Sequence, residues 1–402
     1  MDYWTFIFSI LVTLIIYIGA ENVNKDARKV FDLSNDIQSF KSKRSIQKIE
    51  SLKWDPPVAY YIANGINQSY ITKAIENIEN NTCITFSKKE ATINNDYGIN
   101  FVMRASCDFD FYGKNPTGKK GQFIYIGSDC SEDVLKIQEY IHYALGVKSE
   151  HNRIDRENYI SIDNDNVDPL KSHKFTIDDE TVTSLYDTQY DFGSFTHASP
   201  TGFGKNKAQI VTAKEHHEYY KEMMGQKIMV SFNDYKLLNM LYCDKSETCT
   251  NFWYCGEDGG YLDYKNCRNC ICPYGFTGNT CTDIIPHIKS ECKLRNYDAT
   301  YLNQQIYMQG KKSCYFWIGA NYGKKVCMTI KSITFKNNHF HCVDGRAALQ
   351  IKYKKDRGTM GLCFCKNYGN VDIKLKSDDN LVFVHYNGTD NADLLEMYYQ
   401  EC

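Results

Sequence analysis

A stripe of apolar residues at three- and four-residue steps predicts an amphipathic helix over residues 131–146. The stripe consists of Val134, Ile137, Ile141 and Leu145. The Ser-Glu-Asp segment at 131–133 suits the start of this helix, as N-cap and as acids placed against the helix dipole. Gly146 suits its end, where a left-handed residue lets the chain turn away. A polar segment follows, and a strand is expected at YISID, residues 159–163.

Other segments show helical or alternating patterns. A second apolar stripe predicts a helix over residues 71–78, followed by a strand after Cys83. A strand is expected at YGINFVM (97–103), where apolar residues alternate. Residues 292–402 alternate with a period of two over short, turn-bounded stretches, which predicts a β-sandwich.

Composition narrows the class of protein. The 402 residues leave room for two or three domains. With 47 basic and 49 acidic residues the chain is nearly neutral, so neither nucleic acid nor an anionic membrane is expected as a partner.

The beginning of the chain predicts export. Residues 1–20 have an apolar stretch ending in Gly19-Ala20, typical of a signal peptide, with a membrane anchor as the alternative. No second apolar run is long enough to span a bilayer. Residues 21–44 are polar and end in a basic Lys-Ser-Lys-Arg site, so we expect a propeptide that is cut after Arg44.

The 17 cysteines fit an exported chain, because disulfides persist in oxidising compartments. We therefore expect a secreted, extracellular protein with no membrane span once the signal is removed. Glycosylation sequons stand at Asn67, Asn80 and Asn387.

The segment around the predicted helix resembles the zinc-helix signature of the astacin family of metallopeptidases, HExxHxxGxxHExxRxDRDxY. The resemblance rests on Ala-Leu-Gly at 144–146 and Arg-Ile-Asp-Arg at 153–156. In this alignment Glu139, Tyr143 and Ser149 stand where the family has its three zinc histidines. Tyr140 stands where the family has its catalytic glutamate.

The residues that flank the family's zinc site, which we call the frame of the site, are thus kept in this chain. The residues at the zinc and base positions have a different chemistry. A neutral tyrosine phenol is a weak zinc ligand, because its pKa near 10 must first be lowered. Tyr140 cannot take a proton from a metal-bound water at neutral pH as a glutamate base does. In the segment YDFGSFTHA, which resembles the family's Y-D-Y-G-S-x-M-H-Y turn, Thr196 replaces the methionine and Ala198 the tyrosine that stabilises the transition state. Only His197 and the framing residues of this turn are kept.

The resemblance also implies the fold class: an α+β metzincin, astacin-like domain, then a small disulfide-rich EGF-like module and a β-sandwich CUB-like domain. In the first domain it implies a first strand at WDPPVAYYI (54–62) and a final helix that runs into Cys243. We expect these domains at 45–243, 244–282 and 283–402. The run CPYGFTGNTC resembles an EGF-like module, and without the acidic opening of calcium-binding modules no calcium is expected there.

The family patterns imply a set of disulfides. The pairs are Cys83–Cys243, Cys107–Cys130, Cys249–Cys267, Cys255–Cys270, Cys272–Cys281, Cys292–Cys314 and Cys342–Cys365. This set leaves Cys327 to pair with Cys363, and Cys402 as the odd cysteine, free or intermolecular.

Other polar residues near the frame have two interpretations each. Glu139 and His142, at i and i+3, offer a rearranged metal site with His151 and His197 nearby. The alternative is that His142 is a packed or surface residue of the helix and His197 a hydrogen-bonded structural one. Glu150 resembles the family's glutamate that meets the new N-terminus of the mature chain, whereas the alternative is a simple surface ion pair.

Two functions follow from the sequence. The first is a secreted, non-catalytic astacin homologue that binds extracellular proteins or peptides and needs no cofactor. The second is a zinc-dependent endopeptidase that works with altered ligands, and only in that case is zinc expected.

Overall fold

The computed structural model describes most of the chain from Ile46 onward. The described residues are 46–179, 181, 183–243, 249, 255, 259–286, 291–292, 294–336 and 341–402. They all belong to one compact unit, Lys43–Cys402. The expected signal peptide and propeptide lie outside the described residues.

The first half of the astacin-like region is a five-stranded sheet in the order β3-β2-β4-β6-β5. Its strands are β2 (Val58–Ile62), β3 (Phe86–Lys88), β4 (Ile99–Met103), β5 (Asp108–Phe109) and β6 (Gln122–Ile126). Only β5 runs antiparallel to its neighbour. Strands β2 and β6 alternate buried and partly buried residues, as a sheet with one face against a core requires. The strands predicted at 54–62 and 97–103 are β2 and β4.

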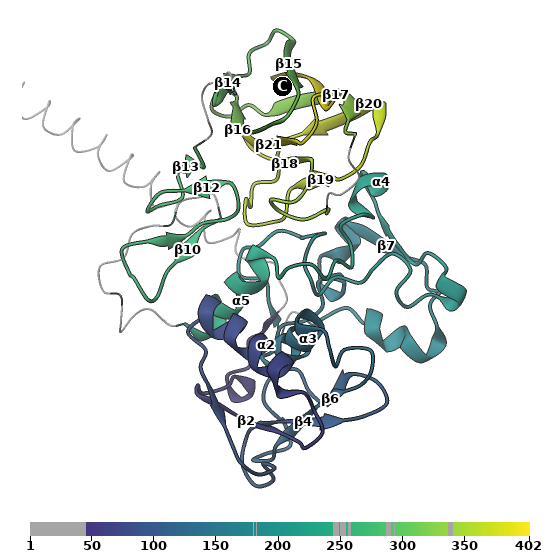
Figure 1. Ribbon diagram of the computed structural model, residues 1–402, viewed down its shortest axis with the longest axis vertical. Helices are drawn as coiled ribbons and strands as arrows, with labels where there is room; N and C mark the ends of the chain where they lie inside the picture. Colours follow the sequence, from purple (N-terminus) through teal and green to yellow (C-terminus); the bar gives the residue numbers. More distant parts are fainter. Residues whose placement is uncertain are drawn as a thin grey trace, which may run out of the picture. The chain divides into compact units, whose positions relative to one another are not determined.

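Helices α2 (Gln68–Asn81) and α3 (Val134–Ala144) lie side by side next to this sheet (Figure 1). The predicted stripe of α2 is its buried face, and it consists of Ile71, Ala74, Ile75 and Ile78. Helix α5 (Phe232–Tyr242) adds Leu237, Leu238 and Tyr242 to the same core. The periodicity therefore located α2 and α3 correctly, and the family resemblance located α5.

Short elements make up the rest of this region. Strand β1 (Ile46–Gln47) pairs with β8 (Thr183–Ser184), and β7 (Ile160–Ile162), which was expected from YISID, pairs with β9 (Val211–Ala213). A single short α-helix, α4 (His217–Tyr220), follows β9. The 3-10 segments are η1 (Glu50–Leu52), η2 (Glu150–Asn152), η3 (Arg156–Asn158), η4 (Pro169–Phe175) and η5 (Lys205–Lys207).

The EGF-like module has two small hairpins among its described residues. Strand β10 (Tyr261–Leu262) pairs with β11 (Cys270–Ile271), and β12 (Phe276–Thr277) pairs with β13 (Asp283–Ile284). A module this short buries little apolar surface, so it depends on its disulfides for stability.

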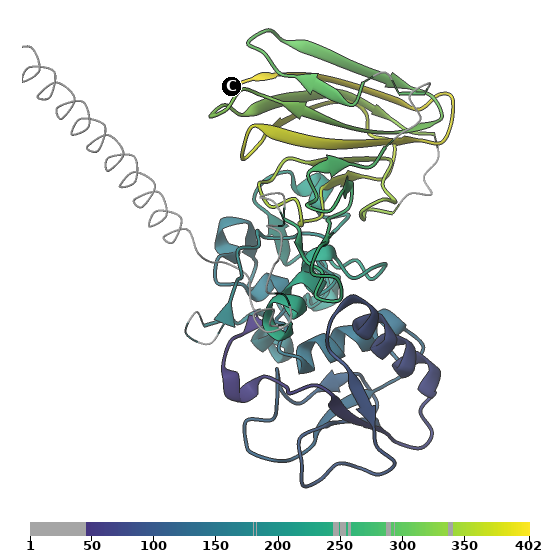
Figure 2. The ribbon, with the colours of Figure 1, turned by 90° about the vertical axis from the view of Figure 1, so that its left-hand side faces the viewer.

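The C-terminal region is the predicted β-sandwich, and Figure 2 shows its strands in layers. One sheet has the order β14-β16-β21-β18-β19 and the other β15-β22-β17-β20. The strands are β14 (Asn296–Asp298), β15 (Gln304–Gln309), β16 (Lys312–Gly319), β17 (Val326–Thr334), β18 (Leu349–Lys352), β19 (Leu362–Phe364), β20 (Gly369–Lys376), β21 (Leu381–Gly388) and β22 (Leu394–Glu401). Their inward residues form one apolar core.

The structure contains the seven disulfides that the family patterns imply. They are Cys83–Cys243, Cys107–Cys130, Cys249–Cys267, Cys255–Cys270, Cys272–Cys281, Cys292–Cys314 and Cys342–Cys365. The eighth bridge corrects the expectation for the remaining three cysteines. Cys327 pairs with Cys402, and Cys363 is a buried free thiol. The reason is the β-sheet register, which places Cys327 of β17 and the end of β22 side by side.

A loop of the sandwich packs against the astacin-like region. The Asp356 carboxylate accepts hydrogen bonds from the Gln189 backbone N–H at 3.0 Å and from Asn233 Nδ2 at 3.0 Å. The Met360 backbone N–H donates to Asp191 Oδ1 at 3.2 Å. These buried, charge-assisted bonds hold the loop on the turn that begins at Tyr190.

Substituting Cys402 tests the corrected pairing. In denaturant without reductant, the unmodified chain should titrate one thiol, Cys363. Cys402→Ser should titrate two, because Cys327 is then released. A Cys327–Cys363 bridge would instead leave no thiol in Cys402→Ser, which would contradict the structure.

The same variant should be less stable. The bridge joins residues 75 positions apart, so its loss should lower the free energy of unfolding by about 4 kcal/mol through loop-closure entropy. Urea unfolding measures this change, with Cys363→Ser as a control that keeps every bridge.

Candidate functional site

Both ends of helix α3 are fixed by hydrogen bonds. At the start, Asp133 Oδ1 accepts from the backbone N–H groups of Leu135 and Lys136 at 3.0 and 3.1 Å. At the end, Gly146 has φ +97°, the left-handed conformation expected there. Trp54 Nε1 donates to the Ala144 carbonyl at 2.7 Å, so a helix-end acceptor is satisfied by a side chain 90 residues away. The face of α3 that carries the candidate site residues is thereby held in one position.

The three residues at the zinc-histidine positions lie together and are hydrogen-bonded to one another. The Tyr143 hydroxyl donates to Glu139 Oε1 at 2.7 Å, and the Ser149 hydroxyl donates to Tyr143 Oη at 3.3 Å. Tyr143 and Ser149 are buried, at 8% and 7% exposure. The frame therefore still brings the three positions together, as the alignment predicted.

A lysine ammonium completes this cluster. Lys227 Nζ donates to Glu139 Oε1 at 2.9 Å and also to the Phe195 carbonyl oxygen. The Glu139 side chain is 14% exposed and that of Lys227 26%. A carboxylate removed this far from water needs a paired cation. Lys227 provides the positive charge beside Glu139.

These groups do not fit a zinc ion. Zinc binds thiolate, imidazole or carboxylate, and only Glu139 offers one of these, already paired with Lys227. Burial, and then the nearby Glu139 charge, raises the pKa of Tyr143 well above 10. The phenol therefore keeps its proton, and the Ser149 hydroxyl is neutral as well.

The residue at the catalytic-glutamate position has a structural contact. The Tyr140 hydroxyl donates to the Cys107 carbonyl at 3.2 Å, and burial raises its pKa. Its ring lies among other aromatic rings, with Phe109 at 6.1 Å and Tyr143 at 6.1 Å between centroids. Phe109 also stacks on Tyr143 at 5.0 Å. A packed group of rings thus stands beside the position of the family's general base.

The turn at 190–198 is held by polar groups. The Thr196 hydroxyl accepts from the Glu150 backbone N–H at 3.2 Å and lies 3.0 Å from Ser194 Oγ. Ser194 Oγ donates to Asp234 Oδ1 at 2.7 Å. Thr196, at the position of the family's methionine, therefore has a hydroxyl that is hydrogen-bonded to Glu150, in the segment after α3. Ala198 contributes its backbone N–H, which donates to His151 Nδ1 at 3.0 Å.

Two of the three nearby histidines have structural partners on both ring nitrogens. His151 Nδ1 accepts from Ala198, so its Nε2 carries the proton and donates to the Lys174 carbonyl at 3.2 Å. His197 Nδ1 donates to its neighbour's carbonyl, and its Nε2 accepts from the Tyr190 hydroxyl at 2.7 Å. These contacts support the interpretation as packed structural residues.

The third histidine, His142, is also fully buried. Its Nδ1 lies 2.9 Å from the Gln138 carbonyl, and its ring packs edge-on against Phe195 at 4.8 Å. Burial lowers the pKa of His142 and of His197 to about 4, so both are neutral at physiological pH. His142 therefore lies in a pocket of helix backbone and aromatic rings, away from the Glu139 cluster.

Glu150 belongs to a buried ionic network. Its Oε1 accepts from the Asp191 backbone N–H at 2.7 Å and lies 3.6 Å from Arg153 Nη1. Arg153, fully buried, also forms a two-bond pair with Asp155, at 2.8 and 2.7 Å. Ser45, the expected new N-terminus, lies outside the described residues, so the predicted contact with Glu150 stays a prediction.

Among the described residues, one group of three metal-type side chains comes close together elsewhere. It consists of Cys107, Asp129 and Cys130. The two cysteines are joined in a disulfide, so their sulfurs are not thiolates and this group is no metal site.

The residues that sequence reasoning missed are those that complete the cluster from other segments. Lys227 follows Met224-Gly225-Gln226, and no local pattern indicates that its ammonium reaches Glu139. Asp234 is identifiable in retrospect, because Ser231 and Asp234 have capping-box spacing at the start of α5.

The fold and the preserved frame are those of a metzincin-type peptidase domain. Residues 46–243 match the astacin family of peptidases. These residues form an astacin-family domain.

Known relatives agree with this assignment. Zinc metalloproteinase nas-34 of Caenorhabditis elegans is 28% identical over 360 residues, which cover 89% of this chain and 57% of that protein. Zinc metalloproteinase dpy-31 of Brugia malayi is 31% identical over 257 residues, covering 63% and 42%. Blastula protease 10 of Paracentrotus lividus is 26% identical over 358 residues, covering 86% and 58%. The chain spans about half the length of these relatives.

Removing the lysine ammonium tests the cluster. Lys227→Met should lower the free energy of unfolding by about 2 kcal/mol, because it leaves the Glu139 carboxylate partly buried without its cation. The double variant Glu139→Gln/Lys227→Met should recover part of this loss, and urea unfolding of the four chains gives the coupling energy. Lys221→Met, which breaks an exposed pair with Glu218, is the control and should change nothing measurable. Additive losses at 139 and 227 would contradict the pairing.

The buried histidines predict a pH dependence. Their pKa is lower in the folded chain than the usual 6.5, so below pH 6.5 the unfolded state binds more protons. Stability should therefore fall as the pH drops from 6.5 toward about 4, by about 1.4 kcal/mol per pH unit for each histidine. Unfolding in urea at pH 6.5 and pH 5.0 measures this slope. His142→Phe should reduce the slope of stability against pH by the contribution of one histidine. An unchanged slope would show that His142 is not buried in its neutral form.

Proposed function

We propose that this chain is a secreted, non-catalytic member of the astacin family that acts by binding extracellular proteins or peptides. The observation that carries the proposal is the Glu139–Tyr143–Ser149 cluster with Lys227 beside it. Neutral hydroxyls and an ion pair stand where the chemistry needs three metal ligands. Tyr140 and Ala198 likewise offer neither a general base nor a transition-state hydroxyl.

The binding role draws support from what the chain retains. The peptidase frame is kept with its buried ionic network, and EGF-like and CUB-like regions follow it. Secretion is supported by the disulfide content and by the expected signal peptide. Among the described residues, no helix has the length and apolar character to cross a membrane.

The second candidate is a zinc endopeptidase with altered ligands. Family membership and the metalloproteinase relatives favour it. In that case Glu139 is the one residue of the three suited to hold the metal, which makes its substitution decisive.

Metal content and proteolysis separate the two candidates. The purified mature chain, incubated with zinc and dialysed, should hold no stoichiometric zinc by elemental mass spectrometry and should not cleave casein or gelatin. Tight zinc at one ion per chain that is lost in Glu139→Ala would overturn the proposal.

A restored variant provides the positive control. It carries Glu139→His, Tyr140→Glu, Tyr143→His, Ser149→His and Ala198→Tyr, which rebuild the family's signature on this frame. Zinc uptake by this variant, under conditions in which the unmodified chain takes up none, would assign the difference to these five positions rather than to the preparation.

A further inference from the structure

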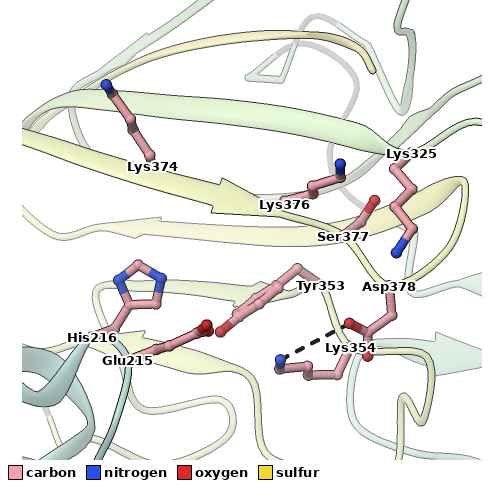
Figure 3. Close-up of a pocket in the computed structure, with 9 residues that line it drawn as sticks. All are labelled: Glu215, His216, Lys325, Tyr353, Lys354, Lys374, Lys376, Ser377 and Asp378. Atoms are coloured by element: carbon pink, nitrogen blue, oxygen red, sulfur yellow. Dashed lines mark ion pairs between the residues drawn. The ribbon is translucent and has the colours of Figure 1, made fainter.

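A hollow of about 580 Å³ lies at β20, the edge strand of one sheet of the sandwich (Figure 3). Four lysines from three separate segments line it. They are Lys325, Lys354, Lys374 and Lys376. Lys374 and Lys376 lie across the hollow from His216 and Lys354 (Figure 3).

The hollow has an excess of positive charge, with four lysines against the two acids Glu215 and Asp378. Lys354 lies 3.9 Å from Asp378, whose carboxylate also accepts from Gln189 Nε2 at 2.9 Å. In the described part of the chain, no carboxylate lies within 4.0 Å of the ammonium groups of Lys325, Lys374 and Lys376. The other acid of the lining, Glu215, has no ion pair with them either. Like charges gathered in this way raise the affinity for an anion.

The walls of the hollow are held in place. The register of β17 and β20 sets Lys376 opposite Cys327 and Lys374 opposite Thr329. Lys325 is fixed by two backbone hydrogen bonds with Cys402, at 3.1 and 2.9 Å, next to the Cys327–Cys402 bridge. The three unpaired lysines therefore start from fixed backbone positions, and a ligand need not order the backbone to meet them.

The spacing of the lysines indicates a ligand with several charges. Lys374 and Lys376 are alternate residues of one strand, so their Cα atoms stand about 7 Å apart on the same face. Lys325 adds a third cation from the neighbouring segment. Cations offered along one strand and beside it suit a chain with repeated anionic groups.

The residue types indicate which anion. All the lining cations that are charged at neutral pH are lysines, with no arginine among them. A lysine ammonium acts as a point charge, so it can bind the oxygens of a sulfate or phosphate group without a fixed orientation. An extracellular ligand with repeated tetrahedral oxyanions is a sulfated polysaccharide.

We propose that this hollow binds a sulfated oligosaccharide, with sulfate groups held by Lys325, Lys374 and Lys376. The site is separate from the Glu139 cluster and does not depend on whether that cluster binds zinc. The choice of a matrix polysaccharide over a phosphorylated ligand rests on the secretion proposed above. The binding measurement itself does not, so the two proposals fail independently.

The test uses the mature chain and a heparin-derived tetrasaccharide in isothermal titration calorimetry. The unmodified chain should bind it, and the affinity should fall as salt is raised, because exposed charges are screened. Lys374→Ala/Lys376→Ala should weaken binding about tenfold or more, and Lys325→Ala should weaken it by a smaller factor. Lys331→Ala is the matched control and should leave the affinity within about twofold. Lys331 lies in the same sheet but is already paired with Asp372.

Four results would overturn the proposal. The first is no binding of the tetrasaccharide, and the second is equal binding of its desulfated form. The third is an equal loss in Lys331→Ala, which would mean diffuse attraction to a basic face. The fourth is tighter binding of inorganic phosphate or polyglutamate than of the tetrasaccharide, which would assign the hollow to phosphorylated ligands or to acidic proteins. Thermal unfolding of each variant confirms that it is folded before binding is compared.

Discussion

The pairing of Glu139 with Lys227 is the interaction around which the astacin-like site is arranged. A carboxylate on the inner face of α3 is costly to bury alone, and the ammonium at 2.9 Å offsets that cost. Lys227 also donates to the Phe195 carbonyl, so one cation joins the helix to the turn at 190–198. Tyr143 and Ser149 then satisfy one another around the same carboxylate. In a metallopeptidase a metal joins such segments, and here hydrogen bonds and an ion pair do so.

The surrounding polar network follows from this arrangement. Glu150 accepts from the Asp191 N–H, and Asp191 in turn accepts from Met360 of the sandwich. The turn is therefore held on one side by residues that follow α3 and on the other by a loop of the CUB-like region. The buried His197 of this turn is neutral, because burial disfavours a charged imidazole. Polar contacts from both sides thus hold the turn in place.

Much of this organisation was predictable from local patterns and family resemblance. The stripes of α2 and α3 and the strands of the sandwich follow from spacing, because each element must bury one face. The residue types at 131–133 and Gly146 indicated the ends of α3, and the structure makes Asp133 the N-cap. The alignment on residues 144–146 and 153–156 placed Glu139, Tyr143 and Ser149 correctly beside one another. Sequence alone left two interpretations of the histidines, and the hydrogen-bond partners of the His151 and His197 rings favour the structural one.

The sequence by itself determined the elements, their order and the loss of histidines from the zinc positions, because these depend on residue type and local period. Tertiary structure alone decided which distant groups meet. It brought Lys227 to Glu139, joined Cys327 to Cys402 rather than to Cys363, and gathered lysines from three segments into one hollow. The physical reason is that these contacts depend on strand register and on how elements pack against one another. A local pattern records the buried face of an element and not the identity of the residue that it will face.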